Sequence, residues 1–417
     1  MENLQPKLRF PEFKEKINFD LFKNHFDLIS GYAFKSDYFN EDGIDLIIPK
    51  NFSKNGYGNF NENINKKTLE NVDEKFTATK DDLLILLTDL TPSCELLGNP
   101  LYIKDDKLHY VNQRISKVVI TNNLDKNYLK YILLTRRYKT HIIETATGTT
   151  VRHSSNKAVL NYKFFIPTLQ EQTKIADFLG AVDKQLNILN QKKEKLTTYK
   201  KGVMQQLFSQ QIRFKDDNGN DFPDWQEKTL GEIGNSFNGL TGKTAKDFGE
   251  GKKYIQYKQI FDKPYIDFND CGFVNIIENE KQNECKIGDV FFTVSSETKE
   301  EIAMSSVIES SVDFPVYLNS FCFGIRFKEN VLIPKFSRFY FRNEIFRKSV
   351  IVLAQGSTRF NLSKVNFMKL TITIPSIAEQ TKIAEFLSAI DNQIEAIENQ
   401  ITKTETYKKG LLQQMFV

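Results

Sequence analysis

Apolar residues recur with helical heptad spacing in two long segments of the chain. Between Pro167 and Phe208, and again between Pro375 and Phe416, they alternate in steps of four and three residues. Kept over about 40 residues, this spacing predicts two helices of ~60 Å, each with a narrow seam that needs a partner helix. The seam positions are Ile175, Leu179, Val182, Leu186, Leu189, Leu196, Val203 and Leu207 in the first segment, and Ile383, Leu387, Ile390, Ile394, Ile397, Ile401, Leu411 and Met415 in the second.

The two segments are also copies of one another. The first reads PTLQEQTKIADFLGAVDKQLNILNQKKEKLTTYKKGVMQQLF and the second PSIAEQTKIAEFLSAIDNQIEAIENQITKTETYKKGLLQQMF. The second copy starts 208 residues after the first (375 − 167), half of the 417-residue chain, which indicates two structural units in tandem. We expect the two helices to pair with each other. The alternative is that each packs separately on its own domain. Glu171 and Glu379 fall in the first turn of each helix, where a carboxylate suits the helix dipole.

The stretches before the two helices differ in sequence, but short, weakly similar segments occur in them in the same order. KDDLLILLT (80–88) resembles KIGDVFFTV (286–294), and FPEF (10–13) matches FPDW (222–225). Their composition predicts short strands, one helix near 128–144 and 336–350, and a closing strand before Pro167 and Pro375. The expected fold class is α+β: two α/β domains in tandem, each followed by a long helix, the two helices pairing as an antiparallel coiled coil with pseudo-twofold symmetry. The predicted boundaries are 1–166, 167–208, 209–374 and 375–417.

Composition narrows the class of protein. A hydrophobic content of 40% and a charged content of 26% are ordinary for a soluble globular protein, and the longest apolar runs are of strand length. The first residues, MENLQPKLRF, lack the apolar core of a secretory signal, and four scattered cysteines suit a reducing compartment. We therefore expect a cytoplasmic protein with no membrane partner. A net charge of +4 permits nucleic-acid binding without demonstrating it.

Three resemblances to catalytic motifs fail. GNPLYI (98–103) differs from the NPPY motif of amino-methyltransferases because Leu101 replaces the second proline. GKT (242–244) is not the end of a P-loop, since Phe237 stands where glycine is required. The four histidines are not spaced as metal ligands. We predict no catalytic residue, cofactor or metal ligand. An atypical solitary DNA methyltransferase and a coiled-coil scaffold that does not bind DNA remain the alternatives.

The repeated segment carries a family resemblance. PxxxEQxKIAxFLxxxD, YKKGxxQQxF and LFSQQIRFKDDNGNDFPDW (207–225) resemble the specificity (S) subunits of Type I restriction–modification systems, and the likeness covers essentially the whole chain. It implies a subunit without catalysis of its own that chooses the DNA sequence. Residues 1–166 and 209–374 would be target recognition domains for the halves of a bipartite, asymmetric double-stranded target. The helices would set the gap and dock two methyltransferase subunits, which restriction subunits join in the full complex. The YKKG ends and the exposed helix faces are our candidates for the docking contacts.

Candidate DNA-binding residues are hydrogen-bond donors on loops that differ between the copies while the flanks match. They are Lys35, Lys50, Asn51, Arg152, His153 and Ser154 in the first half, and Lys243, Lys246, Lys258, Gln259, Arg359 and Asn361 in the second. Arginines on the predicted helices are expected to meet backbone phosphates: Arg136, Arg137, Arg338, Arg342 and Arg347. Ordinary surface charge is the alternative for each of these residues.

Overall fold

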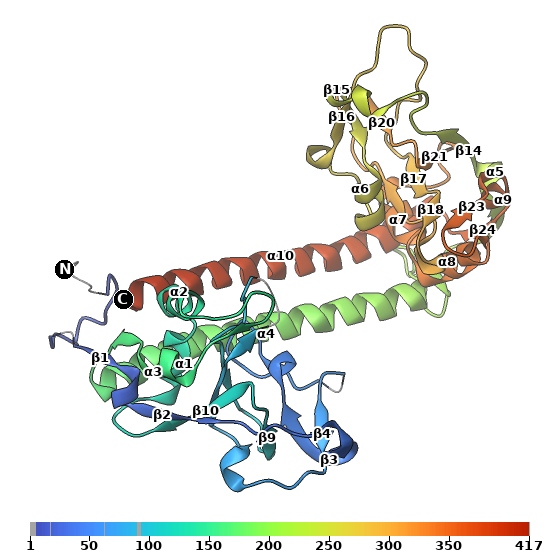
Figure 1. Ribbon diagram of the computed structural model, residues 1–417. Coiled ribbons are helices and arrows are strands. Elements are labelled where there is room, and N and C mark those ends of the chain that lie inside the picture. The colour runs from blue at the N-terminus through green and yellow to red at the C-terminus, as the bar shows by residue number, and fades with distance from the viewer. Residues whose placement is uncertain (1–5, 17, 62, 90–92, 417) are drawn as a thin grey trace. The chain divides into compact units, whose positions relative to one another are not determined.

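The computed structural model describes residues 6–16, 18–61, 63–89 and 93–416. It divides into two compact units (Figure 1). Unit 1 comprises Met1–Asn190 with Asn399–Val417, and unit 2 comprises Gln191–Glu398. Both units therefore contain parts of both long helices, α4 (Leu169–Phe208) and α10 (Ile377–Met415), which confirm the two helices that the heptad pattern predicts.

Unit 1 is built on two four-stranded sheets. The strands of the first follow the order β2-β10-β6-β8, and those of the second β4-β3-β9-β5, with β3 and β9 parallel. The pairs β1–β12 and β7–β11 complete the unit. Its strands are β1 (Phe19–Leu21), β2 (Phe26–Ser30), β3 (Phe39–Ile47), β4 (Lys66–Thr68), β5 (Thr77–Ala78), β6 (Leu83–Leu86), β7 (Thr88–Asp89), β8 (Pro100–Tyr102), β9 (His109–Val111), β10 (Ile115–Ile120), β11 (Arg152–His153) and β12 (Lys163–Phe165). Its shorter helices are η1 (Phe22–Asn24), η2 (Ser36–Tyr38), η3 (Pro49–Asn51), η4 (Glu74–Phe76), α1 (Lys126–Ile132), α2 (Arg136–Glu144) and α3 (Asn156–Leu160).

Unit 2 repeats this plan. One sheet has the order β14-β21-β17-β19, and another has the order β16-β15-β20, with β15 and β20 parallel. Two smaller sheets are β13-β24 and β18-β23-β22. The strands are β13 (Gln226–Thr229), β14 (Gly234–Asn238), β15 (Phe248–Ile255), β16 (Gly272–Val274), β17 (Val290–Thr293), β18 (Ser295–Ser296), β19 (Ser305–Val307), β20 (Val316–Leu318), β21 (Cys322–Phe327), β22 (Ala354–Gln355), β23 (Phe360–Leu362) and β24 (Thr371–Ile374). The shorter helices are α5 (Leu230–Ile233), η5 (Ala245–Asp247), α6 (Tyr257–Asp262), η6 (Phe268–Asp270), η7 (Lys299–Glu301), α7 (Pro334–Tyr340), α8 (Glu344–Ile351) and α9 (Lys364–Met368).

The weakly similar segments of the two halves correspond to equivalent strands. The apolar segments at 80–88 and 286–294 form β6 and β17, each of which pairs on both sides within its sheet. The predicted closing strands are β12 and β24, which pair with β1 and β13. Buried strands flanked on both sides explain why these segments are apolar almost throughout.

The single helix predicted in each half is instead two short helices. In unit 1, α1 ends before Thr135, whose side chain accepts a hydrogen bond from the backbone N–H of Tyr138 and starts α2. In unit 2, Asn343 does the same for α8 through the N–H of Phe346. Threonine and asparagine are strong N-cap residues, so each interrupts the helix although the apolar pattern continues.

The predicted seam of the long helices is confirmed, because all of its residues are buried or half-buried. In unit 1, Ile175 and Leu179 of α4 share one core cluster with Leu411 and Met415 of α10. In unit 2, the end of α4 and the start of α10 meet in the same way; the cluster there includes Val203, Leu207, Ile383, Leu387 and Ile390. Each helix thus packs both on a globular domain and on the other helix, so the two alternatives considered for the sequence are not exclusive.

Ion pairs show that the helices run antiparallel. In unit 2, Lys193 of α4 pairs with Glu398 at 2.7 Å, and Lys200, further along α4, pairs with Asp391, further back on α10. In unit 1, Asp183 of α4 pairs with Lys408 of α10 at 2.5 Å. Unit 1 takes its aspartate from α4 and unit 2 takes its equivalent from α10. This exchange of roles is the reciprocity that pseudo-twofold symmetry requires, and the predicted fold class is confirmed.

The same aspartates tie each domain to the helix pair. In unit 1, Asp183 lies 3.6 Å from Nζ of Lys130 on α1 and accepts a 2.7 Å hydrogen bond from the hydroxyl of Tyr131. The Lys130 side chain is 1% exposed, and burial lowers its pKa to about 7 against the opposing attraction of Asp183. In unit 2, the equivalent residue is Arg338 on α7, at 3.4 Å from Asp391.

The segment that precedes each domain is anchored at the start of a long helix. Arg9 donates two 2.7 Å hydrogen bonds to Glu171, and Arg213 pairs with Glu379 at 2.8 Å. Phe10 and Phe214 pack edge-on against matching rings of α4 and α10. The structure therefore matches Phe10 to Phe214, not to Phe222 as the FPEF and FPDW segments suggest. Both glutamates are fully buried, so they serve as anchors as well as dipole partners.

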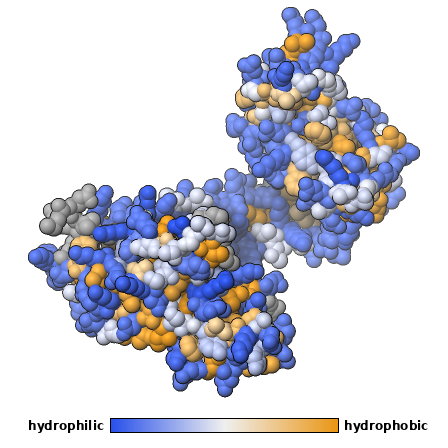
Figure 2. Space-filling view, viewed as in Figure 1, coloured by the Kyte–Doolittle hydropathy of each residue, from blue (hydrophilic) through white to orange (hydrophobic). Residues whose placement is uncertain are grey.

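The face seen in Figure 2 is mainly hydrophilic over both units, with smaller hydrophobic areas between. Within the described part of the chain, no helix combines the length and apolar character needed to cross a membrane.

Candidate nucleic-acid interface

A short antiparallel ladder occupies the same place in both units and carries three of the candidate residues. In unit 1, β11 pairs with β7 so that Arg152 lies opposite Asp89 and His153 opposite Thr88. In unit 2, β23 pairs with β18 so that Phe360 lies opposite Ser296 and Asn361 opposite Ser295. The backbone frame is thus shared, while the side chains that it presents differ.

The turn before each ladder strand requires glycine. Gly148 and Gly356 have φ values of 93° and 126°, which disfavour any side chain. A Cβ at Gly148 would lie 2.1 Å from the carbonyl oxygen of Val151, and one at Gly356 would lie 2.2 Å from that of Arg359. The two units therefore share a fixed turn, and the residue after it can vary.

The ladder side chains differ in how freely they can reach a ligand. Arg152 is half-buried, and its guanidinium donates to the carbonyl of Ile143 at 3.2 Å. His153 is exposed and contacts Thr88 through Nδ1 at 3.0 Å, and Ser154 is half-buried. In unit 2, both Arg359 and Asn361 are exposed.

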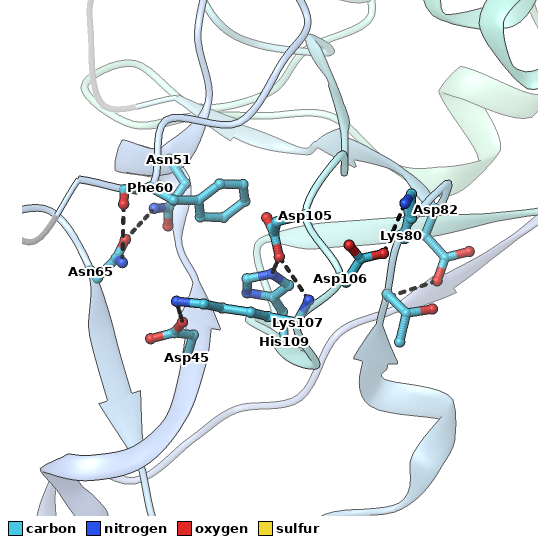
Figure 3. Close-up of polar contacts among 11 residues, drawn as sticks. Asp45, Asn51, Phe60, Asn65, Lys80, Asp82, Asp105, Asp106, Lys107 and His109 are labelled. Carbon is cyan, nitrogen blue, oxygen red and sulfur yellow. Dashed lines mark hydrogen bonds and ion pairs between the residues drawn. The ribbon is translucent and has the colours of Figure 1, made fainter.

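Two of the predicted base-reading amides are interior groups instead. Asn51 is 1% exposed, and its oxygen accepts a hydrogen bond from the N–H of Ile48. Its amide donates to the carbonyl of Asn59 and to the side chain of Asn65, and Figure 3 shows the contact with Asn65. The equivalent Gln259 is 3% exposed and bonds to the backbones of Asp267 and Asp270. Each amide holds the loop that follows it, whereas the neighbouring lysines, Lys50 and Lys258, are exposed.

The loop held by Asn51 continues into a packed polar cluster. Phe60 stacks on the buried ring of His109 with 4.9 Å between ring centroids, and His109 contacts Asp105 through Nε2 at 2.8 Å (Figure 3). Burial raises the pKa of Asp105, but the hydrogen bonds from His109 and from the N–H of Lys107 outweigh it and leave that pKa below its usual value. This cluster supports the loop from inside.

The other lysines fall into two groups. Lys35 and Lys246 are exposed, beside η2 and within η5. Lys243 is instead paired with Glu280 at 2.5 Å, and its side chain is 8% exposed. A lysine that already forms an ion pair attracts a DNA phosphate less strongly than a solvated lysine does.

The expectation that the helical arginines of unit 2 meet phosphates is wrong. Arg342 donates to the carbonyls of Ser305, Ile260, Phe261 and Lys263, and Arg347 donates to those of Glu300, Ile302 and Ala303. Burial lowers the pKa of each arginine to about 10. Arg338 is held by Asp391 and Glu309. Arg342 and Arg347 donate to backbone carbonyls and Arg338 donates to carboxylates, and a linear sequence pattern cannot reveal either arrangement. Arg136 and Arg137 of unit 1 instead line a hollow of about 660 Å³.

The same surface of unit 2 also has an acidic part, which the candidate hydrogen-bond donors do not include. A hollow of about 710 Å³ beside the ladder is lined by Arg359 and also by Tyr257, Ser295, Glu297 and Glu301. The hydroxyl of Tyr257 donates to the carbonyl of Ser295 at 2.7 Å, which joins α6 to the ladder. The acidic run ETKEE (297–301) was the available signal, but a search for hydrogen-bond donors does not select it.

The architecture is that of a duplicated recognition protein: two domains share one backbone frame and carry different side chains on it, and each packs on parts of the same two long helices. A family model described as "Type I restriction modification DNA specificity domain" matches residues 19–198 and 223–405. These two matches cover most of the chain, so it belongs to that family, and it acts in DNA sequence specificity.

Relatives and solved structures agree. The specificity subunit of Type I restriction enzyme MjaVIII of Methanocaldococcus jannaschii is 25% identical over 296 residues, 69% of each chain. The putative MjaX specificity subunit of the same organism is 24% identical over 308 residues, 70% of this chain and 67% of the relative. The S subunit from M. genitalium has the same fold, with a TM-score of 0.55 at 15% identity over 99% of both chains. A structure described for assembly and conformational transition of the type I system gives a TM-score of 0.58 at 14% identity, over 96% of this chain and 97% of the other.

Proposed function

We propose that the chain is the non-catalytic specificity subunit of a cytoplasmic Type I restriction–modification complex, and that residues 1–166 and 209–374 each read one half of a bipartite, asymmetric DNA target. The observation that carries this proposal is the duplicated ladder. Gly148 and Gly356 preserve the turn, while the next positions present Arg152 and His153 in unit 1 but Phe360 and Asn361 in unit 2. Identical frames with unlike side chains suit two unlike half-sites.

The paired helices, residues 167–208 and 375–417, act in this proposal as the spacer. Helices α4 and α10 contain 40 and 39 residues. At ~1.5 Å per residue each is about 60 Å long, so the helix length sets the distance between the reading domains and hence the unread gap in the DNA. The ion pairs of Asp183 and Asp391 fix the register in which the helices pair.

The same helices dock two methyltransferase subunits, which restriction subunits join in the full complex. The first lysine of each YKKG segment is already used, because Lys200 and Lys408 pair with aspartates. The remaining side chains point outward: Tyr199 is 52% and Tyr407 54% exposed. Lys201 and Lys409 are also exposed. The two YKKG segments thus expose the same tyrosine and lysine, as two docking sites for identical methyltransferase subunits would.

A domain exchange tests the reading function. Residues 209–374 are replaced by the corresponding domain of another family member, and the DNA motif bound by the complex is determined before and after. We expect one half-site to change while the other half-site and the gap stay the same. Replacing 1–166 should change the opposite half-site. A change of both half-sites after a single exchange would refute the modular assignment.

The docking surface has its own test. Tyr199→Ala together with Tyr407→Ala should reduce the amount of methyltransferase subunit that copurifies with the chain. The matched control is Ile188→Ala, which changes another exposed apolar residue of α4, 48% accessible, outside the YKKG segment. Equal copurification of all three proteins would exclude the YKKG surface as the docking site.

A further inference from the structure

Two carboxylates, those of Glu297 and Glu301, line the acidic hollow of unit 2. Among the described residues, neither of them forms an ion pair, although Arg359 lines the same hollow. Glu297 is exposed and Glu301 is half-buried. On a surface that approaches DNA, an uncompensated carboxylate is repelled by the phosphates and weakens binding. Its presence is favourable where a base supplies a hydrogen-bond donor.

The arginine of the hollow is held in place but retains donors. Its Nη2 donates to the hydroxyl of Ser295 at 3.1 Å, and Ser295 lies opposite Asn361 in the ladder. A guanidinium carries five N–H donors, so this contact orients Arg359 and leaves enough donors for a bidentate interaction. The backbone of Ser295 is itself fixed by Tyr257.

The combination of a cation and carboxylates around one hollow matches the major-groove edge of one kind of base pair. Arginine pairs with the O6 and N7 acceptors of guanine, and a glutamate accepts from the N4 amino group of cytosine. An A·T pair offers no equivalent to the guanine O6 beside its N7. A G·C pair therefore satisfies both charges. An A·T pair places the adenine N6 donor where guanine has O6, and the thymine O4 acceptor where cytosine has its N4 donor, so in these positions it fits the arginine and the glutamates less well.

We propose that the hollow formed by Arg359, Glu297 and Glu301 reads a G·C base pair in the half-site recognised by unit 2. This inference rests on the proposed function. It also assigns the contact to unit 2 alone. In unit 1, Val151 stands at the position of Arg359 and offers no side-chain donor to a base.

The test selects DNA sites from a library of random duplexes with the full chain assembled with its methyltransferase subunits. The wild type is compared with Arg359→Ala and with the double variant Glu297→Gln/Glu301→Gln. We expect a G·C preference at one position of one half-site. Each variant should lower that preference by about tenfold or more, because a good bidentate base contact discriminates at this level. The other half-site should stay unchanged.

Glu300→Gln is the control for charge removal, because it removes one carboxylate from η7 at an exposed position outside the hollow. Thermal unfolding of all variants establishes that they are folded. If the wild type selects no motif, the proposed function fails. If it selects a bipartite motif but the double variant and Arg359→Ala leave the base preference unchanged, or Glu300→Gln alters it equally, the assignment of the hollow fails while the function stands.

Discussion

Replacing Asp183 by asparagine should destabilise unit 1 more than the equivalent change destabilises unit 2. The Asp183 side chain is 9% exposed and faces two lysines, Lys408 at 2.5 Å and Lys130 at 3.6 Å. Removing one partner of a buried ion pair costs about 3–5 kcal/mol, because the other charge is left unpaired. Since ~1.4 kcal/mol is a factor of ten, the open population of unit 1 should rise on the order of a hundredfold to a thousandfold.

Asp391→Asn is the matched variant. Its side chain is 30% exposed, and Arg338 keeps a second partner, Glu309, at 3.3 Å. The loss there should be about 1–3 kcal/mol, the usual cost of an unsatisfied polar group.

Amide hydrogen exchange measures the two effects separately. Peptides from α1 and α2 report on unit 1, and peptides from α7 and α8 report on unit 2. Faster exchange should be confined to unit 1 in Asp183→Asn, and Lys408→Met should recover part of the loss by removing one unpaired charge. Equal effects of Asp183→Asn and Asp391→Asn, or no effect of either, would refute the reasoning.

Three further predictions follow from single sites. The pKa of Lys130 is about 7 in the folded protein and ~10.5 in the unfolded chain, so between these pH values the unfolded state binds more protons. The free energy of unfolding should therefore rise with pH in this range, by at most ~1.4 kcal/mol per pH unit. Denaturant midpoints measured at pH 7, 8 and 9 should show this rise in the wild type and lose it in Lys130→Met. Arg9→Ala leaves the buried carboxylate of Glu171 unpaired and should destabilise unit 1 by about 3 kcal/mol in denaturant unfolding, with Arg213→Ala acting likewise on unit 2. Gly148→Ala should lower the melting temperature and weaken DNA binding, whereas Gly202→Ala, where nothing lies within 4 Å of the added Cβ, should stabilise α4 by about 1 kcal/mol.

Local sequence patterns were sufficient to predict the long helices and the closing strands. Heptad spacing alone located the seam, because a narrow apolar stripe has one way to be buried. The break before α2 was missed because the Thr135 cap depends on a side-chain rotamer and not on periodicity. The match of Phe10 to Phe214 was hidden by the residues inserted before Trp225, and it emerges from their equivalent ring contacts.

The recognition surface was less accessible to sequence reasoning. Asn51 and Gln259 have side chains that can read bases, but both are buried and form hydrogen bonds with the loops that follow them. Arg342 and Arg347 similarly donate their hydrogen bonds to backbone carbonyls. Whether a donor faces solvent or the interior depends on long-range packing, which residue type does not encode.

The central claim is that two domains read two half-sites at a distance set by the helices. The most direct measurement maps modified bases across the genome of a methylation-free host that expresses the chain with its methyltransferase, before and after one heptad is removed from the middle of α4 and the facing heptad from α10. Removing a heptad shortens the pair by about 10 Å, or about three base pairs at ~3.4 Å each. We predict one motif of two short halves whose gap shrinks by that amount while both halves persist. A continuous motif, or an unchanged gap, would contradict the account.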